Sequence, residues 1–512
     1  MRVLLFVIAV LACEARIRVR PEVLSWVLLS LTLWILELRF NGKKDLLFLL
    51  PLIQWVWVNT EGLFFVGWVV MGFYSLSALS ASAKADKKLL KYFVLSLALC
   101  LLNPHFVRGF LFPLSFLNTL GSSEAFKFAA KEFQPPWSIQ DSFSRIPDPY
   151  LLAYKMFSLF LLVLLAANFR RRKLHEWLLA GFFLGLSAIA VRNIPLFMIA
   201  CLPLAALCWK DLRWSWLQKF EDRFIARPFC AGALTLFLLG FSLRVITNAH
   251  YVSNRLSDRF GLGLDIETLP VRACEFLVQN HLDGKIINTL DAGDWLDWKG
   301  PQKTFMDGRL DVMGEELLGE YSASLGEPGP GPFIEKYKPD IVFFNPLYAL
   351  PWMVHLNKRP DWRLVYLDEC TAVYLRQGYA DPIPGLDYDR LLEERGLSKA
   401  IAAQASSLIS MSPPPVWTCL WDDFYKPSTY SNGLLNLGIF TTYTNHPEVA
   451  ETCLLEGIQR TQGRYFDYDY NLGCLYCYGR RYSEALICMK RVLQDQPQNP
   501  VALQMVQSLS PQ

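Results

Sequence analysis

The sequence predicts an all-α membrane bundle of about nine transmembrane helices, followed by a small α/β domain and a C-terminal region of helical repeats. Three observations predict this architecture. Long apolar runs fill the chain up to about residue 247, the charge density beyond residue 248 is that of a soluble domain, and a short motif near the C-terminus recurs at a fixed offset. Only 19% of the residues are charged, against about a quarter in soluble proteins, which excludes an ordinary soluble enzyme. A net charge of +3 is too small to indicate a nucleic-acid partner.

The apolar runs define the first domain, residues 1–247. They lie at about residues 3–13, 22–37, 46–58, 62–82, 89–102, 149–168, 175–191, 194–208 and 229–247. A helix of about 20 apolar residues crosses the hydrocarbon core of a bilayer, and several of these runs meet that length. The shorter runs are expected to be tilted or partly buried, and the first is interpreted as a short span rather than a signal peptide. Membrane lipid is therefore an expected partner.

The positions of Lys and Arg predict the orientation of the bundle. They gather in the connections at residues 39–44, 84–88, 170–173 and 209–228, which we therefore expect to face the cytoplasm. The loop at residues 103–148 and everything after residue 247 then face outward. One connection contradicts the rule, because it carries Arg16, Arg18 and Arg20 on the outward side.

The soluble half begins with an expected α/β domain at residues 248–378. Strand-like segments occur at 285–290, 340–345, 362–367 and 371–375, and the last two suit a hairpin. Helices are expected at 270–280, 314–324 and 347–357. A connector follows at 379–429, with one short helical stretch near 391–407. No glycine-rich phosphate loop follows any of the strands, so dinucleotide binding is unsupported.

Residues 430–512 contain a repeat. Asn436-Leu437-Gly438 aligns with Asn471-Leu472-Gly473 at an offset of 35 residues, and the same offset pairs Ala450 with Ala485 and Cys453 with Cys488. The second copy resembles a tetratricopeptide repeat, which implies paired helices that approach closely at the small residues and a surface for a protein partner. The pair Cys474-x-x-Cys477 has no second pair or His partner, so core packing is preferred over a metal or redox role.

Polar motifs interrupt the apolar half at four places: Asn59–Gly62, Asn103–His105, Glu132–Pro136 and Arg192–Pro195. Polar groups in a bilayer are costly unless partnered or hydrated, so such motifs mark candidate functional positions. Together with Asp307-Gly308-Arg309-Leu310-Asp311 in the soluble half, their order resembles bacterial polytopic proteins of the GT-C glycosyltransferase superfamily over about residues 15–378. One departure is Glu61, which stands where that group usually has His.

The resemblance implies transfer of a sugar from a polyprenyl-phosphate carrier to an acceptor at the outer face of the bacterial cytoplasmic (inner) membrane, with the C-terminal half extracytoplasmic. This chemistry requires a carboxylate base and cationic stabilisation of the departing phosphate. The expected catalytic carboxylates are Glu61, Glu132, Asp141 and Asp148. The expected substrate-binding residues are Asn59, His105, Arg108, Gln134, Arg192, Asn193, Asp307 and Arg309. The sequence indicates no metal ligands, and the reaction class leaves room for a divalent cation, so the cofactor is unknown.

Structural interpretations of the same residues stay open. Arg192 also suits an interface anchor, and Asp307 with Arg309 also suits an ion pair that holds a turn. In the superfamily the first outward loop commonly supplies the catalytic carboxylate, and we expect this sequence to begin after that loop. That expectation favours the alternative hypothesis, a non-catalytic membrane scaffold that binds partner proteins through residues 430–512.

Overall fold

The computed structural model describes residues 2–17, 20–82, 86–113, 131–137, 149–212, 228–249, 251, 260–309, 313–327, 329–346, 348–412 and 431–509. The chain divides into two units. The first comprises Met1–Ser142 and Ile146–Gly232, and the second comprises Phe143–Arg145 and Ala233–Gln512. Aspartates 141 and 148, both expected to be catalytic, lie outside the described residues, as does Asp311.

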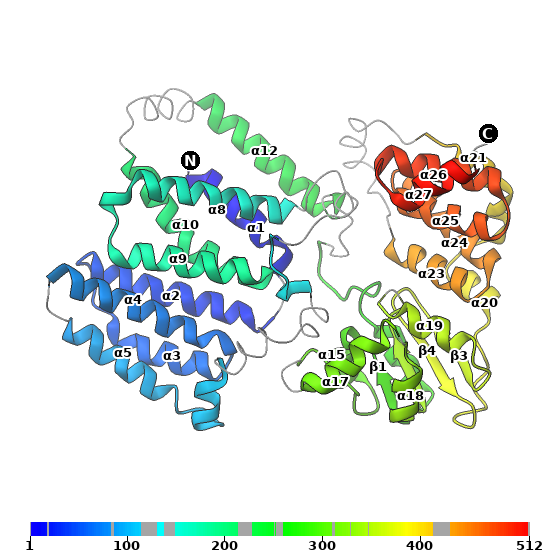
Figure 1. Ribbon diagram of the computed structural model, residues 1–512, viewed down its shortest axis with the longest axis horizontal. Coiled ribbons are helices and arrows are strands. Elements are labelled where there is room, and N and C mark those ends of the chain that lie inside the picture. The colour runs from blue at the N-terminus through cyan, green and yellow to red at the C-terminus, as the bar shows by residue number, and fades with distance from the viewer. Residues whose placement is uncertain are drawn as a thin grey trace. The chain divides into compact units, whose positions relative to one another are not determined.

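Each of the nine apolar runs coincides with a helix. The helices are α1 (Arg2–Cys13), α2 (Glu22–Phe40), α3 (Leu50–Val58), α4 (Phe65–Ser82), α5 (Lys87–Leu99), α8 (Pro149–Ala167), α9 (Leu174–Ile189), α10 (Ile194–Asp211) and α12 (Pro228–Ile246). In Figure 1 helices α2–α5, α8 and α9 lie side by side with similar axis directions. Among the described residues, four segments are long and apolar enough to cross a membrane: Glu22–Phe40, Gly62–Ser80, Tyr150–Ala167 and Val191–Asp211. Shorter apolar helices occupy Val3–Cys13, Leu47–Val58, Leu174–Ile189 and Thr235–Ile246.

The bundle of the first unit is apolar both inside and outside. Its core contains fully buried large side chains, among them Trp57, Phe157 and Phe197. Its outer surface is also rich in exposed Leu, Val and Phe. Helix α12, most of which belongs to the second unit, likewise exposes Leu236, Phe237 and Leu239. A helix that is hydrophobic on all sides suits a lipid environment, since no aqueous face is needed.

The helices of this bundle meet at two ends. At one end, short 3-10 turns precede or join the helices: η1 (Glu14–Arg16), η3 (Gly62–Phe64), η4 (Lys131–Phe133) and η6 (Val191–Asn193). At the other end α2 and α4 finish and α9 begins, so that Phe40, Tyr74 and His175 pack together, with His175 stacked 4.3 Å from the Tyr74 ring. The residues that connect the helices at the first end form the candidate site.

The second unit contains a four-stranded sheet in the order β1-β2-β4-β3. Strands β1 (Ile286–Asn288) and β2 (Ile341–Phe344) are parallel, and β2 and β3 (Trp362–Leu367) are each antiparallel to β4 (Ala372–Arg376). The four predicted strands and the terminal hairpin are confirmed. Helices α14 (Val271–Gln279), α15 (Leu290–Lys299), α17 (Glu315–Ser324), α18 (Gly331–Tyr337) and α19 (Leu350–Asn357) accompany the sheet.

The short apolar run just before Asp307 also predicts a strand from the sequence, and this strand does not form. The apolar residues before Asp307 have no regular secondary structure. Their backbone is hydrogen-bonded to the side chain of Asn288 instead of to a neighbouring strand. Its amide nitrogen donates to the carbonyl of Met306 at 2.7 Å, and its oxygen accepts from the N–H of Phe305 at 2.9 Å. Two backbone groups that would pair in a fifth strand are therefore hydrogen-bonded to one side chain.

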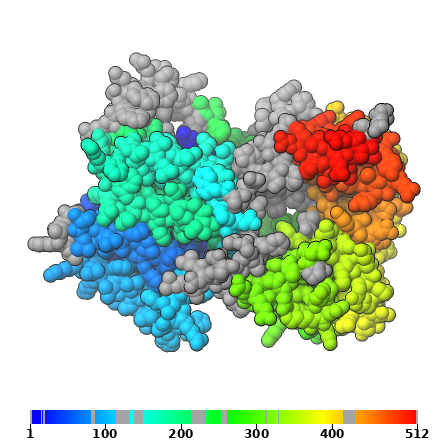
Figure 2. All heavy atoms as spheres, in the orientation of Figure 1, coloured from blue at the N-terminus to red at the C-terminus, as the bar shows by residue number. Residues whose placement is uncertain are grey.

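Helices from the connector and the repeat region complete the second unit. They are α20 (Tyr388–Glu394), η8 (Lys399–Gln404), α21 (Ala405–Ile409), α23 (Asn432–Tyr443), α24 (Pro447–Thr461), α25 (Phe466–Tyr478), α26 (Tyr482–Asp495) and α27 (Pro500–Leu509). Residues of the sheet and of these helices belong to one hydrophobic core. In the space-filling view, α25, α26 and α27 form one continuous surface (Figure 2).

Candidate functional site

A cluster of arginine and glutamate side chains lies at the end of the bundle where the 3-10 turns gather. It brings together three residues predicted from the sequence, Glu61, Glu132 and Arg192. It also contains Arg16 and Glu22, which the sequence analysis did not select. We call these five residues, with Arg20, the charged cluster.

Arg16 and Glu22 form the buried centre of the charged cluster. Both side chains are only 7% exposed, and Arg16 Nη2 lies 2.5 Å from Glu22 Oε1. Arg16 ends the turn η1 and Glu22 begins α2, so the pair fixes the entry of the chain into that helix. A buried charge is tolerated only when it is paired and hydrogen-bonded, and each of these residues supplies the counter-charge of the other.

Glu61 is held by hydrogen bonds from two elements, α2 and η3. Its Oε2 accepts from the hydroxyl of Ser25 at 2.6 Å and from the N–H of Leu63 at 2.7 Å, which makes Glu61 the cap of η3. The indole of Trp57, fully buried, donates to the Ser25 hydroxyl at 2.7 Å. These bonds fix Oε2 in place and leave Oε1 facing Arg192. Oε1 accepts no hydrogen bond from Ser25 or Leu63 and can therefore interact with a ligand.

Glu132 is bound by two arginines from the connection before α2. Its Oε2 pairs with Arg16 and lies 2.6 Å from Arg20 Nη1. Burial favours the neutral acid, but the guanidinium groups of Arg16, Arg20 and Arg192 outweigh it and hold the pKa of Glu132 below its ordinary value. Glu132 is therefore an ionised, weakly basic carboxylate, better suited to orienting cations than to accepting a proton.

Arg192 lies between two carboxylates without a close bond to either. Its Nη2 is 3.8 Å from Glu22 Oε2 and 3.9 Å from Glu61 Oε1, and its guanidinium carbon is 5.0 Å from the ring centroid of Phe133. The Nε atoms of Arg192 and Arg16 are buried and have no hydrogen-bond partner among the described residues. An anionic ligand would supply the missing acceptors, because buried donors are normally satisfied.

The cluster is anchored to the long loop through its backbone. The N–H of Val191 donates to the carbonyl of Gln134 at 3.1 Å, which joins the η4 segment to η6. This bond places Glu132 and Arg192 at one site although they are far apart in the sequence. The same site pairs the two arginines of the connection before α2, Arg16 and Arg20, with Glu22 and Glu132.

Other predicted residues of the first unit take structural positions. Asn59 donates to the carbonyls of Trp55 and Leu102, and Asn193 donates to that of Leu186. His105 and Arg108 are exposed in a turn whose bonds are made by Asn103. None of these four side chains bonds to the charged cluster within the described residues.

The predicted pair Asp307 and Arg309 lies in the second unit. Arg309 Nε donates to Asp307 Oδ1 at 3.0 Å, and Arg309 Nη2 lies 3.0 Å from Asp297 Oδ2. The bonds to Arg309 hold the pKa of Asp307 below its ordinary value. Asp307 is buried and Arg309 is exposed, which is the arrangement expected of an ion pair that holds a turn.

The residues missed by sequence reasoning share one signal. Arg16, Glu22 and Ser25 flank or begin the second apolar run, where a charge beside a hydrocarbon-length helix needs a partner. No group of three or more His, Cys, Asp or Glu residues suitable for a metal was found in the described part of the chain. Comparison with protein-family models, curated proteins and solved structures finds no match to this chain.

Proposed function

We propose that this protein is a GT-C-like integral membrane glycosyltransferase that transfers a sugar from a polyprenyl-phosphate donor at the outer membrane face, and that the charged cluster is its active site. The single observation that carries the proposal is the position of Arg192. Its guanidinium is 18% exposed, is held near two carboxylates at loose ion-pair distances, and keeps an unused Nε donor among the described residues. A planar guanidinium with free donors suits a phosphate group.

The roles of the carboxylates follow from their surroundings. Glu61 is the proposed base, because Ser25 and Leu63 orient one oxygen and leave the other facing Arg192. Glu132 is the proposed positioning residue, because two arginines already engage it. In the reaction the acceptor hydroxyl oxygen bonds to the anomeric carbon as its proton passes to Glu61. The bond between that carbon and the phosphate oxygen breaks, and the phosphate leaves with the electron pair beside Arg192.

The test uses the full chain in lipid nanodiscs with a polyprenyl-phosphate sugar and an added acceptor. The variant Glu61→Gln is expected to lose turnover while retaining donor binding, and Arg192→Gln is expected to weaken donor binding by about tenfold or more. The matched control is Asp45→Asn, whose carboxylate pairs with Lys88 at the opposite end of the bundle. Unchanged turnover in Glu61→Gln would show that Glu61 is not the base. A larger loss of donor binding in exposed Arg108→Gln than in Arg192→Gln would show that the donor binds elsewhere.

The finer topology is part of the same proposal. Nine spans would place the charged cluster and the chain after residue 247 outside, and the Lys- and Arg-rich connections in the cytoplasm of a multi-pass inner-membrane protein. The gathering of Lys and Arg in the connections at residues 39–44, 84–88, 170–173 and 209–228 supports this orientation. A phosphatase reporter fused after residue 512 should be active and a reporter fused after residue 212 inactive. The reverse pattern would overturn the topology.

A second candidate function is supported by the repeat helices. Helices α23 and α25 begin and end about one repeat apart, and Gly438 and Gly473 each face a side chain of the partner helix, Leu454 or Met489. Tyr443 and Tyr478 occupy the same repeat position and are 47% and 78% exposed. Large exposed aromatic side chains at matching positions suit a tetratricopeptide-like platform for a protein partner.

Site-directed photo-crosslinking in native membranes tests this second function. A crosslinking amino acid at Tyr478 is expected to capture one discrete partner, whereas the same group at Arg460 on helix α24 is not. Tyr443→Ala should abolish the crosslink at Tyr478. Equal capture at both positions would reject a specific platform.

A further inference from the structure

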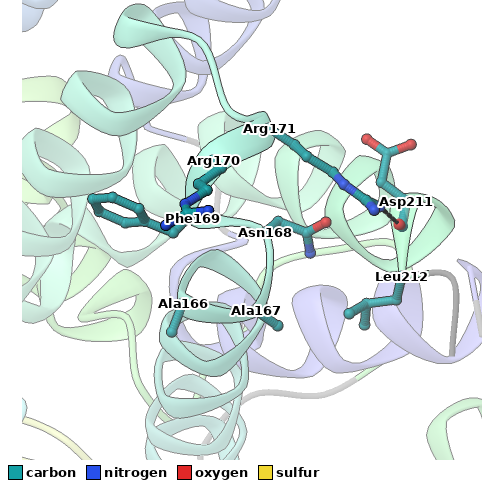
Figure 3. Close-up of a pocket in the computed structure, with 8 residues that line it drawn as sticks. All are labelled: Ala166, Ala167, Asn168, Phe169, Arg170, Arg171, Asp211 and Leu212. Atoms are coloured by element: carbon teal, nitrogen blue, oxygen red, sulfur yellow. Dashed lines mark hydrogen bonds between the residues drawn. The ribbon is translucent and has the colours of Figure 1, made fainter.

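A pocket of about 410 Å³ lies at the end of the bundle opposite the charged cluster, where α8 and α10 finish. Its lining is Ala166, Ala167, Asn168, Phe169, Arg170, Arg171, Asp211 and Leu212. The volume is within the range of about 300–1,000 Å³ usual for small-ligand sites. The pocket therefore has room for a compact polar group at the level where spanning helices end (Figure 3).

Asn168 contributes a buried acceptor that lacks a donor. The side chain is 1% exposed, and its Nδ2 donates to the carbonyls of Leu164 and Cys208 at 2.9 and 3.1 Å. Both partners are acceptors, so the amide orientation is fixed and Oδ1 is the atom left over. Among the described residues Oδ1 has no hydrogen-bond partner. A buried acceptor in a pocket wall favours a ligand that brings an N–H or O–H donor.

The charges around the pocket favour an anion. Arg172, whose side chain is 4% exposed, pairs with the carboxylates of Asp211 and Glu176 and offsets one of their two negative charges. With Arg170 and Arg171, this group of five side chains carries a net charge of +1. Arg171 Nη1 donates to the backbone carbonyl of Asp211, and Figure 3 shows this contact above Asn168. Arg170 is exposed and pairs with no described residue. Arg170 and the remaining donors of Arg171 therefore present uncompensated positive charge at the pocket.

An apolar row leads away from the pocket along α8. Leu159, Leu162 and Val163 are 58%, 47% and 62% exposed, and with Ala166 they follow the helical spacing of one face. Phe169 is 68% exposed on the other side of the pocket. A chain of hydrocarbon on this face would end at the arginines, as the acyl chains of a phospholipid end at its phosphate.

We propose that this pocket binds the headgroup of an anionic, hydroxyl-bearing phospholipid of the phosphatidylglycerol type, with the phosphate on Arg170 and Arg171, a headgroup hydroxyl donating to Asn168 Oδ1, and an acyl chain along α8. An ethanolamine headgroup fits less well, because its ammonium would need a carboxylate and that of Asp211 is already paired with Arg172. The inference does not rest on the proposed glycosyl transfer, since the two sites lie at opposite ends of the helices.

The experiment is native mass spectrometry of the full chain in detergent with equimolar lipid mixtures. Phosphatidylglycerol is expected to bind about tenfold more tightly than phosphatidylethanolamine, and more tightly than phosphatidylmethanol, which carries the same charge but no headgroup hydroxyl. The double variant Arg170→Gln/Arg171→Gln should lose the preference for both anionic lipids. The matched control Lys43→Gln/Lys44→Gln removes the same charge from an exposed connection and should keep the preference.

Three outcomes would overturn the proposal. Equal loss in the lysine control would show a diffuse electrostatic attraction rather than a site. Equal binding of phosphatidylglycerol and phosphatidylmethanol would remove Asn168 from recognition. Displacement of the lipid by soluble glycerophosphoglycerol at comparable concentration would show that the headgroup alone is the ligand and that α8 contributes nothing.

Discussion

Asp469 gives the second unit a stability that falls as the pH rises. The residue is fully buried in α25, and neither of its oxygens has a hydrogen-bond partner among the described residues. Arg491 Nη1 lies 3.2 Å from Asp469 Oδ1, but the guanidinium already donates to the carbonyls of Leu408, Ile409 and Gly463. Burial raises the pKa of Asp469 from its ordinary value of 3.8 to about 7, against the attraction of Arg491 and with a further contribution from Asp467.

The sign and size of the effect follow from proton linkage. A group whose pKa is higher in the folded than in the unfolded state stabilises the fold while it is protonated, and loses that contribution as the pH rises through the folded pKa. The difference between 3.8 and about 7 corresponds to about 4 kcal/mol in total. Between pH 5 and pH 7.5 the repeat helices should therefore lose up to about 3 kcal/mol. Asp469→Asn should remove this dependence and stabilise the helices at pH 7.5.

The assay is alkylation of the buried thiols of Cys453 and Cys488 in the full chain, read by peptide mass spectrometry. The rate at each pH is divided by the rate for the unfolded chain at the same pH, so that the intrinsic reactivity of the thiol cancels and the opening free energy remains. Protection that is equal at pH 5 and pH 7.5 in the wild type would refute the reasoning. So would a slope that Asp469→Asn leaves unchanged.

Three further changes probe the packing of the two units. Glu22→Gln removes one of the two carboxylates that pair with buried Arg16, the other being that of Glu132, and should lower stability by about 1–3 kcal/mol, seen as an earlier unfolding midpoint in detergent. Half-exposed Asp45→Asn should change it by less than about 1 kcal/mol. Gly293→Ala places a methyl group against the backbone of Met306 and should lower the stability of the fold by about 1–3 kcal/mol. The loss is measured by hydrogen exchange in β1, and exchange as slow as in the wild type would show that the two segments do not approach so closely. Gly473→Val, whose Cβ would lie 2.8 Å from Met489 Cε, should push α25 and α26 apart and expose the Cys488 thiol. Unaltered thiol protection would show that the Met489 side chain moves aside and that the two helices stay together.

Much of the architecture could be predicted from local sequence patterns. The nine apolar runs became helices, the four strand-like segments became strands, and the hairpin of β3 and β4 formed as expected. Such features depend on the spacing of apolar residues along a few helical turns or one strand, and this spacing can be taken directly from the sequence. The offset of 35 residues also separates the first residues of α24 and α26, Pro447 and Tyr482.

The candidate site could be predicted only in part from the sequence. Glu61, Glu132 and Arg192 were selected from polar motifs between apolar runs, yet nothing local indicated that they meet. Asn59 was selected beside Glu61, but its amide bonds to the carbonyls of Trp55 and Leu102, since neighbouring positions on a helical turn point in different directions.

The sequence by itself determined the kind of elements, their order and the contrast between an apolar first half and a more highly charged second half, because these follow from composition and short-range periodicity. Tertiary structure alone decided which charges are paired. Arg16 and Glu132 are 116 residues apart, and their contact exists because the η4 segment is bonded to η6 and the helices bring both ends to one level. The same packing decided that Arg192 keeps a free donor and that Asn168 keeps a free acceptor. A buried polar group acquires its partner, or lacks one, only when the surrounding helices fix what lies within a few ångströms of it.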